Sequence, residues 1–176
     1  MVETPAIKEI KVLSFELGGE AYGLAVHQVL GVNPMLPIVP IPQAPNFVEG
    51  VVRIRDQVIP VIDLRKRFGL AGKPSEKKPR LIVAKVRDIR VALLVDGVLR
   101  VTALAAGNID PPSPVLDHAS LLKGVAKLEQ GILLLLDLDK ILSAEEVQTL
   151  AEVPEKVKPK KKKGRHNAEA EDPRGG

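Results

Sequence analysis

Charged residues interrupt one otherwise apolar stretch and are the first candidates for chemistry. Residues 50–69, GVVRIRDQVIPVIDLRKRFG, place four arginines, two aspartates and a lysine among residues that are mostly Val, Ile and Leu. A hairpin that turns at 56–57 would put Arg53 and Arg55 on one strand face, with the intervening apolar residues toward the core. Guanidinium groups on a rigid strand can bind a partner's carboxylates or carbonyls. A solvated face, paired with the neighbouring aspartates, fits the same pattern.

Motifs typical of catalysis or metal binding do not stand out elsewhere. The sequence has no G-x-S-x-G, G-x-x-x-x-G-K-[ST] or H-E-x-x-H motif and no cysteine. His27, His118 and His166 are far apart in sequence, which favours surface or capping roles. Asp137 and Asp139 resemble the start of a calcium loop, but the required glycine and closing glutamate are missing. We therefore expect no enzymatic activity, no cofactor and no bound metal.

Short strand signals predict an all-β fold that presents these arginines. Alternating apolar residues and intervening turn residues predict four hairpins, over 12–26, 50–63, 80–98 and 123–138. Gly69 is expected to end a short helical turn that follows the second hairpin. Strands at this spacing suggest small barrels, and the polar segment 71–79 suggests a break between two units.

Three other segments lack the alternating pattern. The spacing of Val26 and Val29 suits one or two helical turns, and the five prolines between 33 and 47 exclude both helix and regular ladder there. Ser143 and Glu146 form a capping box, which predicts a helix of about ten residues that ends before Pro154.

The excess positive charge lies at the end of the chain. The formal net charge is +4, yet residues 1–153 hold 18 basic and 18 acidic side chains, while 154–176 hold eight basic and four acidic ones. The last segment has one valine and no larger apolar residue, so we expect a disordered basic tail. It either docks to nucleic acid or an acidic partner, or serves as a solvated extension. A nucleic-acid-binding small barrel that uses this tail is therefore the alternative function, although it would also need a basic groove with stacking aromatics.

Cellular location follows from apolar runs and cysteine content. The first residues are charged, and even the longest pure apolar runs, such as 132–136, are too short to span a bilayer. Absence of cysteine fits a reducing compartment. We expect a cytoplasmic protein without a membrane segment of its own.

Five motifs in order resemble those of the CheW chemotaxis coupling proteins. They are FELGGEAYGLAVHQV, PIPQAPNFVEGVVRIRDQVIPVIDLRKRFG, LIVAKVRDIRVALLVDGV, GVAKLEQGILLLLDLDKIL and SAEEV, and they extend from about Val12 to Val147. The resemblance implies two packed five-stranded SH3-like β-barrels with short helices and a C-terminal helix, over residues 8–153. It also implies a non-catalytic adaptor with two partners, the regulatory domain of a CheA-type histidine kinase and the cytoplasmic tip of a chemoreceptor. Membrane association would be indirect, through the receptor.

The resemblance further implies a receptor-binding hairpin. The family motif G-V-x-N-L-R-G is matched at Gly50, Val51 and Arg55, whereas Arg53 replaces the Asn and Asp56 replaces the last Gly. Receptor contacts are therefore expected at Gly50, Arg53 and Arg55. Asp tolerates a left-handed turn better than most residues, so the hairpin should survive with some strain.

Kinase contacts are expected around Val26, Val29 and Gly31. Gly31 stands where the family usually carries the glutamate of V-x-E-I. Loss of that carboxylate and gain of Arg53 make the surface more positive. These two changes favour a paralogue that serves a non-flagellar chemosensory system, such as surface motility.

Overall fold

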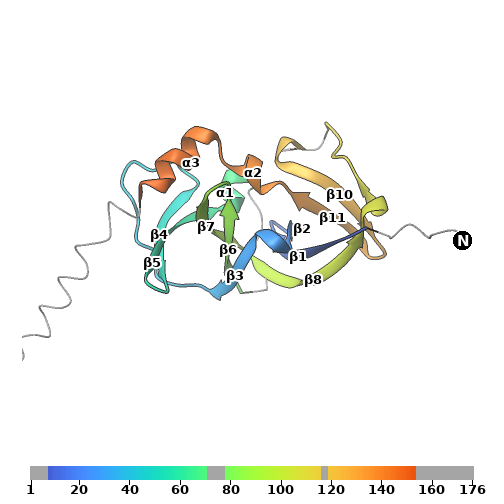
Figure 1. Ribbon diagram of the computed structural model, residues 1–176, viewed down its shortest axis with the longest axis horizontal. Helices are drawn as coiled ribbons and strands as arrows, with labels where there is room; N and C mark the ends of the chain where they lie inside the picture. Colours follow the sequence, from blue (N-terminus) through green and yellow to red (C-terminus); the bar gives the residue numbers. More distant parts are fainter. Residues whose placement is uncertain (1–7, 71–77, 116–118, 154–176) are drawn as a thin grey trace, which may run out of the picture.

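The protein consists of two β-sheets that lie end to end (Figure 1). The computed structural model describes residues 8–70, 78–115 and 119–153. The six-stranded sheet contains, in spatial order, β8 (Gly97–Ala105), β1 (Glu9–Leu17), β2 (Glu20–Ala25), β11 (Gly131–Leu136), β10 (Leu122–Leu128) and β9 (Ile109–Asp110). The five-stranded sheet contains β3 (Val29–Pro34), β6 (Arg80–Val86), β7 (Ile89–Val95), β5 (Gln57–Asp63) and β4 (Val48–Ile54). The predicted all-β, double-barrel class is confirmed. The prediction gave five strands to each barrel, and the additional strand of the larger sheet, β9, has only two residues.

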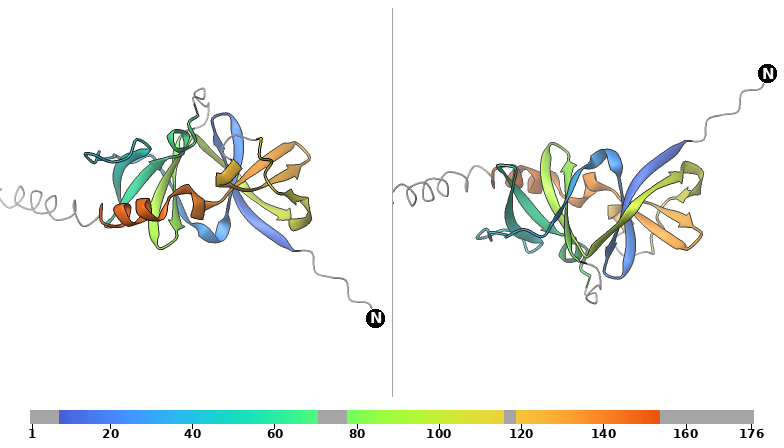
Figure 2. Two further views of the ribbon diagram at one scale, coloured as in Figure 1. Left: turned by 90° about the horizontal axis from the view of Figure 1, so that it is seen from above. Right: turned by 90° about the horizontal axis from the view of Figure 1, so that it is seen from below.

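Short helices occupy the strand connections. They are the 3-10 turns η1 (Val26–Gln28), η2 (Ala106–Asn108) and η3 (Ala119–Leu121) and the α-helices α1 (Leu64–Phe68), α2 (Leu138–Ile141) and α3 (Ala144–Ala151). Helix α2 lies between the two sheets and α3 lies over the five-stranded one (Figures 1 and 2). The predicted capping box of α3 is present, with Ser143 Oγ accepting from the Glu146 amide at 3.0 Å. Within the described ranges, no helix is long and apolar enough to cross a membrane.

The order of the strands shows that the five-stranded sheet is inserted in the chain between two parts of the six-stranded sheet. The chain leaves the six-stranded sheet after β2, builds the whole five-stranded sheet with β3 to β7, and returns at β8. The break predicted near 71–79 falls between α1 and β6, and both β5 and β6 belong to the five-stranded sheet. That break is therefore wrong as a boundary between barrels, because pairing of distant strands, and not linker composition, decides which strands share a sheet. The predicted basic tail, 154–176, lies outside the described residues.

Three apolar clusters show how the sheets are joined. One cluster lies within the five-stranded sheet around Val52, Ile59 and Leu81, and another lies within the six-stranded sheet around Val12 and Leu133. The largest cluster draws residues from both sheets, among them Phe15, Leu24, Ile62, Ile82 and Leu93. Neighbouring residues of β6 alternate between two of these clusters, so this strand is buried on both faces. The two barrels therefore share one core.

The segment from Val26 to Pro34 differs from its prediction. Only Val26–Gln28 is helical, as one 3-10 turn, and the chain then continues as strand β3. β3 is the edge strand of its sheet and pairs only with β6. A proline is tolerated at such an edge because its missing N–H is not needed for a ladder bond. The proline-rich segment that follows makes one isolated bridge, between Val39 and Val51.

The hairpin β4–β5 with α1 has a counterpart in β10–β11 with α2. Gly50 and Gly124 follow a register shift in the first strand of each hairpin. Asp63 and Asp137, which stand at the same spacing from these glycines, cap the N-terminus of the helix that follows. The same hairpin-and-helix unit thus occurs once in each sheet.

Candidate partner-binding groove

The turn of the β4–β5 hairpin lies one residue earlier than predicted. Ile54 pairs with Gln57, so the two-residue turn is Arg55–Asp56, and both residues have positive φ, 50° and 66°. The predicted turn would pair each residue of β4 with a residue two positions further along β5 than in the structure. Because side chains alternate with a period of two, both registers turn the same side chains toward the core. The apolar pattern therefore cannot distinguish them. Turn residues do not separate the two registers either, because Asp56 belongs to both candidate turns and neither turn contains a glycine.

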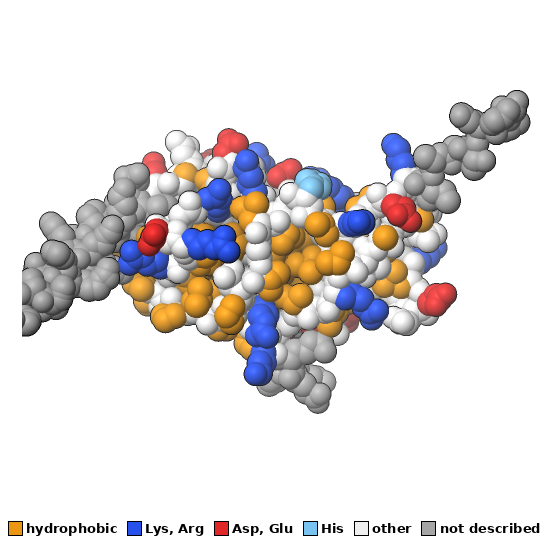
Figure 3. Space-filling view, turned by 60° about the horizontal axis from the view of Figure 1, so that its bottom comes forward, with side chains coloured by type: hydrophobic (Ala, Val, Ile, Leu, Met, Phe, Trp, Pro, Cys, Tyr) orange, Lys and Arg blue, Asp and Glu red, His pale blue; other side chains and the backbone are white. Residues whose placement is uncertain are grey.

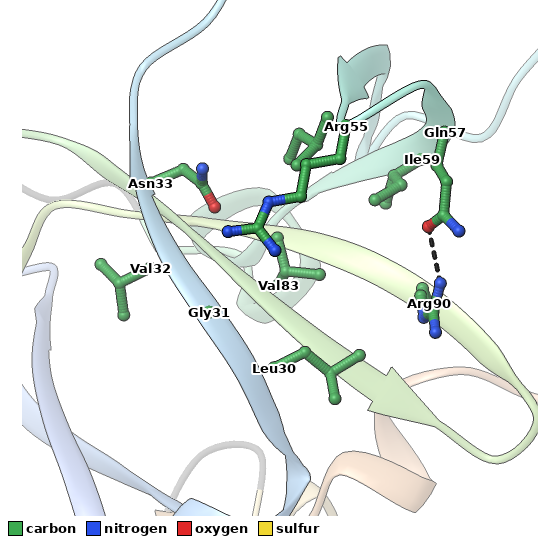
Figure 4. A pocket seen from close by; sticks show the side chains of 10 residues that line it. Leu30, Gly31, Val32, Asn33, Arg55, Gln57, Ile59, Val83 and Arg90 are labelled. Atoms are coloured by element: carbon green, nitrogen blue, oxygen red, sulfur yellow. Dashed lines mark hydrogen bonds between the residues drawn. The ribbon is translucent and has the colours of Figure 1, made fainter.

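Arg55 is therefore a turn residue and does not share a strand face with Arg53. Val52 is buried and Ile54 is partly buried against the same cluster, as the alternation predicts. The Arg55 side chain extends from the turn across a groove toward Asn33 and Gly31 (Figure 4). Arg55 forms no hydrogen bond or ion pair with any residue of the described ranges.

The groove has a volume of about 400 Å³ and is formed by five strands or their ends. Its lining residues are Leu30, Gly31, Val32, Asn33, Ile54, Arg55, Gln57, Ile59, Val83 and Arg90. Arg90 donates from Nη1 to Gln57 Oε1 at 2.6 Å, a neutral acceptor. The lining thus carries two guanidinium groups and no carboxylate, above an apolar floor. Such a groove suits a segment that carries both apolar side chains and a carboxylate or free carbonyl oxygens.

The other cations of residues 50–69 are engaged within the protein. Arg65 lies 3.3 Å from Asp96, and Lys66 Nζ lies 2.6 Å from Glu49. The hydrogen bond to Glu49, with the charge of that carboxylate, raises the pKa of Lys66. The charges of α1 are therefore paired within the protein, whereas the Arg55 side chain has no partner among the described residues.

Arg67 makes the most extensive contacts of the α1 cations. It donates from Nε to the Ile141 carbonyl at 2.6 Å, approaches Glu146 at 3.8 Å, and lies 4.8 Å above the Phe47 ring. These contacts join α1 to α2, to α3 and to the segment before β4. Arg67 thus ties the five-stranded sheet to the C-terminal helices.

The two other predicted receptor residues lie outside this groove. Arg53 is exposed on β4, 3.8 Å from the fully solvated Asp56. Gly50 is buried with φ +147°, and a Cβ atom there would lie 2.1 Å from the Val39 carbonyl oxygen. Gly50 therefore has a backbone role: it allows the proline-rich segment to pair with β4.

The predicted kinase residues are divided between different environments. Gly31 lines the groove beside Arg55, and its α-carbon faces open space with only Asn33 nearby. Val29 packs against the core shared by the two sheets. Val26 lines a separate hollow of about 500 Å³ together with His27 and Lys123. The predicted receptor residue Arg55 and the predicted kinase residue Gly31 thus face each other across one groove.

An apolar face beside the groove was not predicted from sequence. Edge strand β3 exposes Leu30 and Val32, and edge strand β8 exposes Leu99 and Val101, the last at 59%. Both strands lie along the lower side of the molecule in Figure 1, and Figure 3 shows hydrophobic side chains gathered on that side. Gathered apolar side chains on a surface mark an interaction site. The signal in the sequence is weak, since β8 exposes three residues in succession, Leu99 to Val101, instead of alternating.

Histidine and acidic residues form no metal cluster within residues 8–70, 78–115 and 119–153. His27 is exposed in η1, while His118 and His166 lie outside the described ranges. All four aromatic rings of the chain, Phe15, Tyr22, Phe47 and Phe68, are buried. None is available to stack on a base, so the stacking surface that a nucleic-acid-binding barrel needs is missing.

Two barrels with a shared core, an arginine-lined groove and an exposed apolar face suit a protein that binds other proteins. Residues 11–146 match the family described as CheW-like domain. The chemotaxis protein CheW of Thermotoga maritima is 34% identical over 137 residues, covering 78% of this chain and 90% of that protein. The chemotaxis protein CheW of Treponema pallidum is 30% identical over 150 residues, covering 82% and 88%.

A solved structure also matches this chain along most of its length. The crystal structure of the scaffolding protein TtCheW from Thermoanaerobacter tengcongensis matches with a TM-score of 0.73 at 30% identity, over 83% of this chain and 96% of that one. The chain belongs to the CheW-like family. It is an adaptor of chemotaxis signalling, and the alternative of a nucleic-acid-binding barrel has no support.

Proposed function

We propose that this adaptor joins the cytoplasmic tip of a chemoreceptor to the regulatory domain of a CheA-type histidine kinase, and that the Arg55 groove binds the receptor tip. The observation that carries this proposal is the Arg55 guanidinium, which has no side-chain partner among the described residues and lies above an apolar floor. Elsewhere in residues 50–69 the basic side chains of α1 are all paired.

Charge and shape support a receptor helix as the occupant. A helical hairpin can place apolar side chains against Leu30 and Val32 while a carboxylate or a terminal carbonyl reaches Arg55. The exposed apolar residues of β3 and β8 would extend the contact beyond the groove. The planar guanidinium group is pre-organised for paired hydrogen bonds, so it loses less freedom for each bond formed than a lysine would.

The kinase contact is a separate part of the proposal. Of the three kinase candidates, Gly31 lines the Arg55 groove and is therefore assigned to the receptor in this proposal. Val26 and Val29 stay candidates for the kinase, and Val26 offers a surface away from Arg55. A cytoplasmic location and service in a non-flagellar system follow as further expectations. Simultaneous binding of both partners requires that the kinase use a surface other than the Arg55 groove.

The test of the groove is Arg55→Ala, with Arg53→Ala as the matched control. Arg53 carries the same charge on the same hairpin but lies outside the groove. Arg55→Ala should weaken binding of a receptor-tip fragment by about 1–3 kcal/mol, the cost of one lost charge-assisted contact. Arg53→Ala should weaken it by less than about 0.5 kcal/mol. Equal losses in titration calorimetry would mean that only overall charge matters.

Two further variants define the chemistry of the groove. Arg55→Lys should recover little affinity if the contact uses both guanidinium nitrogens. Gly31→Glu places a carboxylate in the open space that Arg55 faces, so it should compete with the receptor for Arg55. Measured against both partners, Gly31→Glu should weaken receptor binding and leave kinase binding intact. Loss of kinase binding alone would assign the groove to the kinase.

A further inference from the structure

Asp96 stands where the chain crosses from one sheet to the other. It follows β7, the last strand of the five-stranded sheet, and precedes β8, with which the chain re-enters the six-stranded sheet. Its side chain is 12% exposed. Asp96 is the single residue between these two strands, so its contacts act directly on the connection between the sheets.

The polar atoms of Asp96 reach both sheets. Oδ2 accepts from the Gly18 amide at 2.8 Å, in the β1–β2 turn of the six-stranded sheet. Oδ1 accepts from Arg65 Nη1 at 3.3 Å, in the helix that follows β5 of the five-stranded sheet. The Asp96 amide donates to the Glu16 carbonyl at 3.0 Å. One residue thus binds a turn from one barrel and a helix from the other.

A packing contact lies beside these bonds. A Cβ atom at Gly18 would lie 3.0 Å from Leu70 Cδ1, so Leu70, which follows the C-cap Gly69 of α1, packs directly on the β1–β2 turn. The turn is therefore held against α1 by the Asp96 carboxylate and by Leu70. Hydrogen bonds of Asp96 and the packing of Leu70 therefore act at the same place, where the β1–β2 turn meets α1.

We infer that Asp96 is a positioning residue that sets the angle between the two sheets and, through it, the geometry of the partner-binding face. The shared apolar core holds the sheets together, but apolar burial is not directional and tolerates sliding. Hydrogen bonds to a nearly buried carboxylate are directional and fix an orientation. β3 and β8 belong to different sheets, so a change in the angle moves their exposed residues relative to each other. The part that concerns partner binding rests on the proposed function.

The first measurement concerns the orientation of the sheets in the protein alone. The chain has no cysteine, so Lys85→Cys on β6 and Lys123→Cys on β10, both exposed, give one spin label in each sheet. In the full chain, Asp96→Ala should broaden the distance distribution between the labels, and Asp96→Asn should broaden it less because its amide oxygen still accepts from Gly18. Asp110→Asn is the matched control, because the Asp110–Lys127 pair, at 3.1 Å, lies within one sheet.

The second measurement is the affinity for a receptor-tip fragment, corrected for the folded fraction of each variant. Both Asp96 variants should lose affinity by about threefold to thirtyfold, although Asp96 lines none of the grooves described above, and Asp110→Asn should lose none. Unchanged label distances in every folded Asp96 variant overturn the inference. Broadened distances with unchanged affinity overturn its link to binding. Failure of the wild-type protein to bind the tip contradicts the proposed function instead, and the label distances still decide the role of Asp96.

Discussion

The hairpins β4–β5 and β10–β11 share a backbone plan and differ in what their turns carry. Each has a glycine after a register shift, an apolar alternation and an aspartate that caps the following short helix. In β10–β11 the turn is Glu129–Gln130, and the positive φ falls on Gly131. In β4–β5 the positive φ values fall on Arg55 and Asp56.

That difference indicates where function lies. A positive φ costs a non-glycine residue about 1 kcal/mol or more, whereas glycine adopts it without a steric penalty. The strained turn is also the one whose arginine has no partner among the described residues. Under the proposed function, one hairpin serves stability and the other presents the receptor-binding side chain. The following predictions test this contrast.

The largest effect is expected at the two glycines. Gly50→Ala would put a methyl group 2.1 Å from the Val39 carbonyl oxygen at a φ of +147°, so it should cost about 3 kcal/mol or more. Gly124→Ala meets Ile109 at 2.7 Å and Asp110 at 2.9 Å without a positive φ, and should cost about 1–3 kcal/mol. Urea unfolding of both variants gives the comparison. Equal costs would mean that the proline-rich segment moves aside.

Arg67 and Arg55 should differ in their effect on stability. Arg67→Ala removes a charged hydrogen bond to the Ile141 carbonyl and a ring contact with Phe47, and should cost about 1–3 kcal/mol. Arg55→Ala should change stability by less than about 0.5 kcal/mol, because its side chain is exposed. Thermal melts of the two variants measure this. A large loss in Arg55→Ala would make Arg55 a structural residue and undermine its proposed role.

Asp56→Gly should relieve part of the backbone strain in the β4–β5 turn. Glycine relieves the positive φ of 66° and removes only an exposed ion pair with Arg53, so the variant should gain about 0.5 kcal/mol. Receptor affinity should stay within about twofold if Arg55 keeps its orientation. Denaturant titration checks the gain, and a loss of stability would show that the Arg53–Asp56 pair outweighs the backbone strain.

The smallest effect concerns alkaline stability. Burial, with a smaller effect of the Glu20 charge, raises the pKa of Tyr22 above its usual 10.0. The folded state therefore holds this proton more tightly than the unfolded state, and stability falls as pH rises above about 10. Lys66, whose pKa is also raised, acts in the same direction. Tyr22→Phe should flatten part of this slope in unfolding free energies measured from pH 9 to 11. An unchanged slope would contradict the assignment to Tyr22.

Patterns of residues close together in sequence were sufficient to predict many of the strands and helix ends. Alternation in β4 predicted that Val52 faces the core, Gly69 was predicted to end α1, and Ser143 with Glu146 was predicted to begin the last helix. Each of these depends on residues close together in sequence. The double-barrel class depended on motifs shared with a known family.

Long-range arrangement could not be predicted in the same way. The register of β4–β5 was missed because the two candidate pairings expose the same side chains. The insertion of the five-stranded sheet within the six-stranded one depends on the pairing of β1 with β8, which is far away in sequence. The same limit applies to the site: Gly31 and Arg55 were assigned to different partners, and only the packing of β3 beside the β4–β5 hairpin brings them to one groove.

The most direct test of the central claim is co-assembly of three purified components: this protein, a receptor-tip fragment and the regulatory domain of a CheA-type kinase. Analytical ultracentrifugation should detect a ternary complex that requires the adaptor. With Arg55→Ala, the receptor fragment should be lost while the complex of adaptor and kinase domain persists. Mutual displacement of the two partners, or equal loss of both in Arg55→Ala, would contradict an adaptor that holds receptor and kinase on separate surfaces.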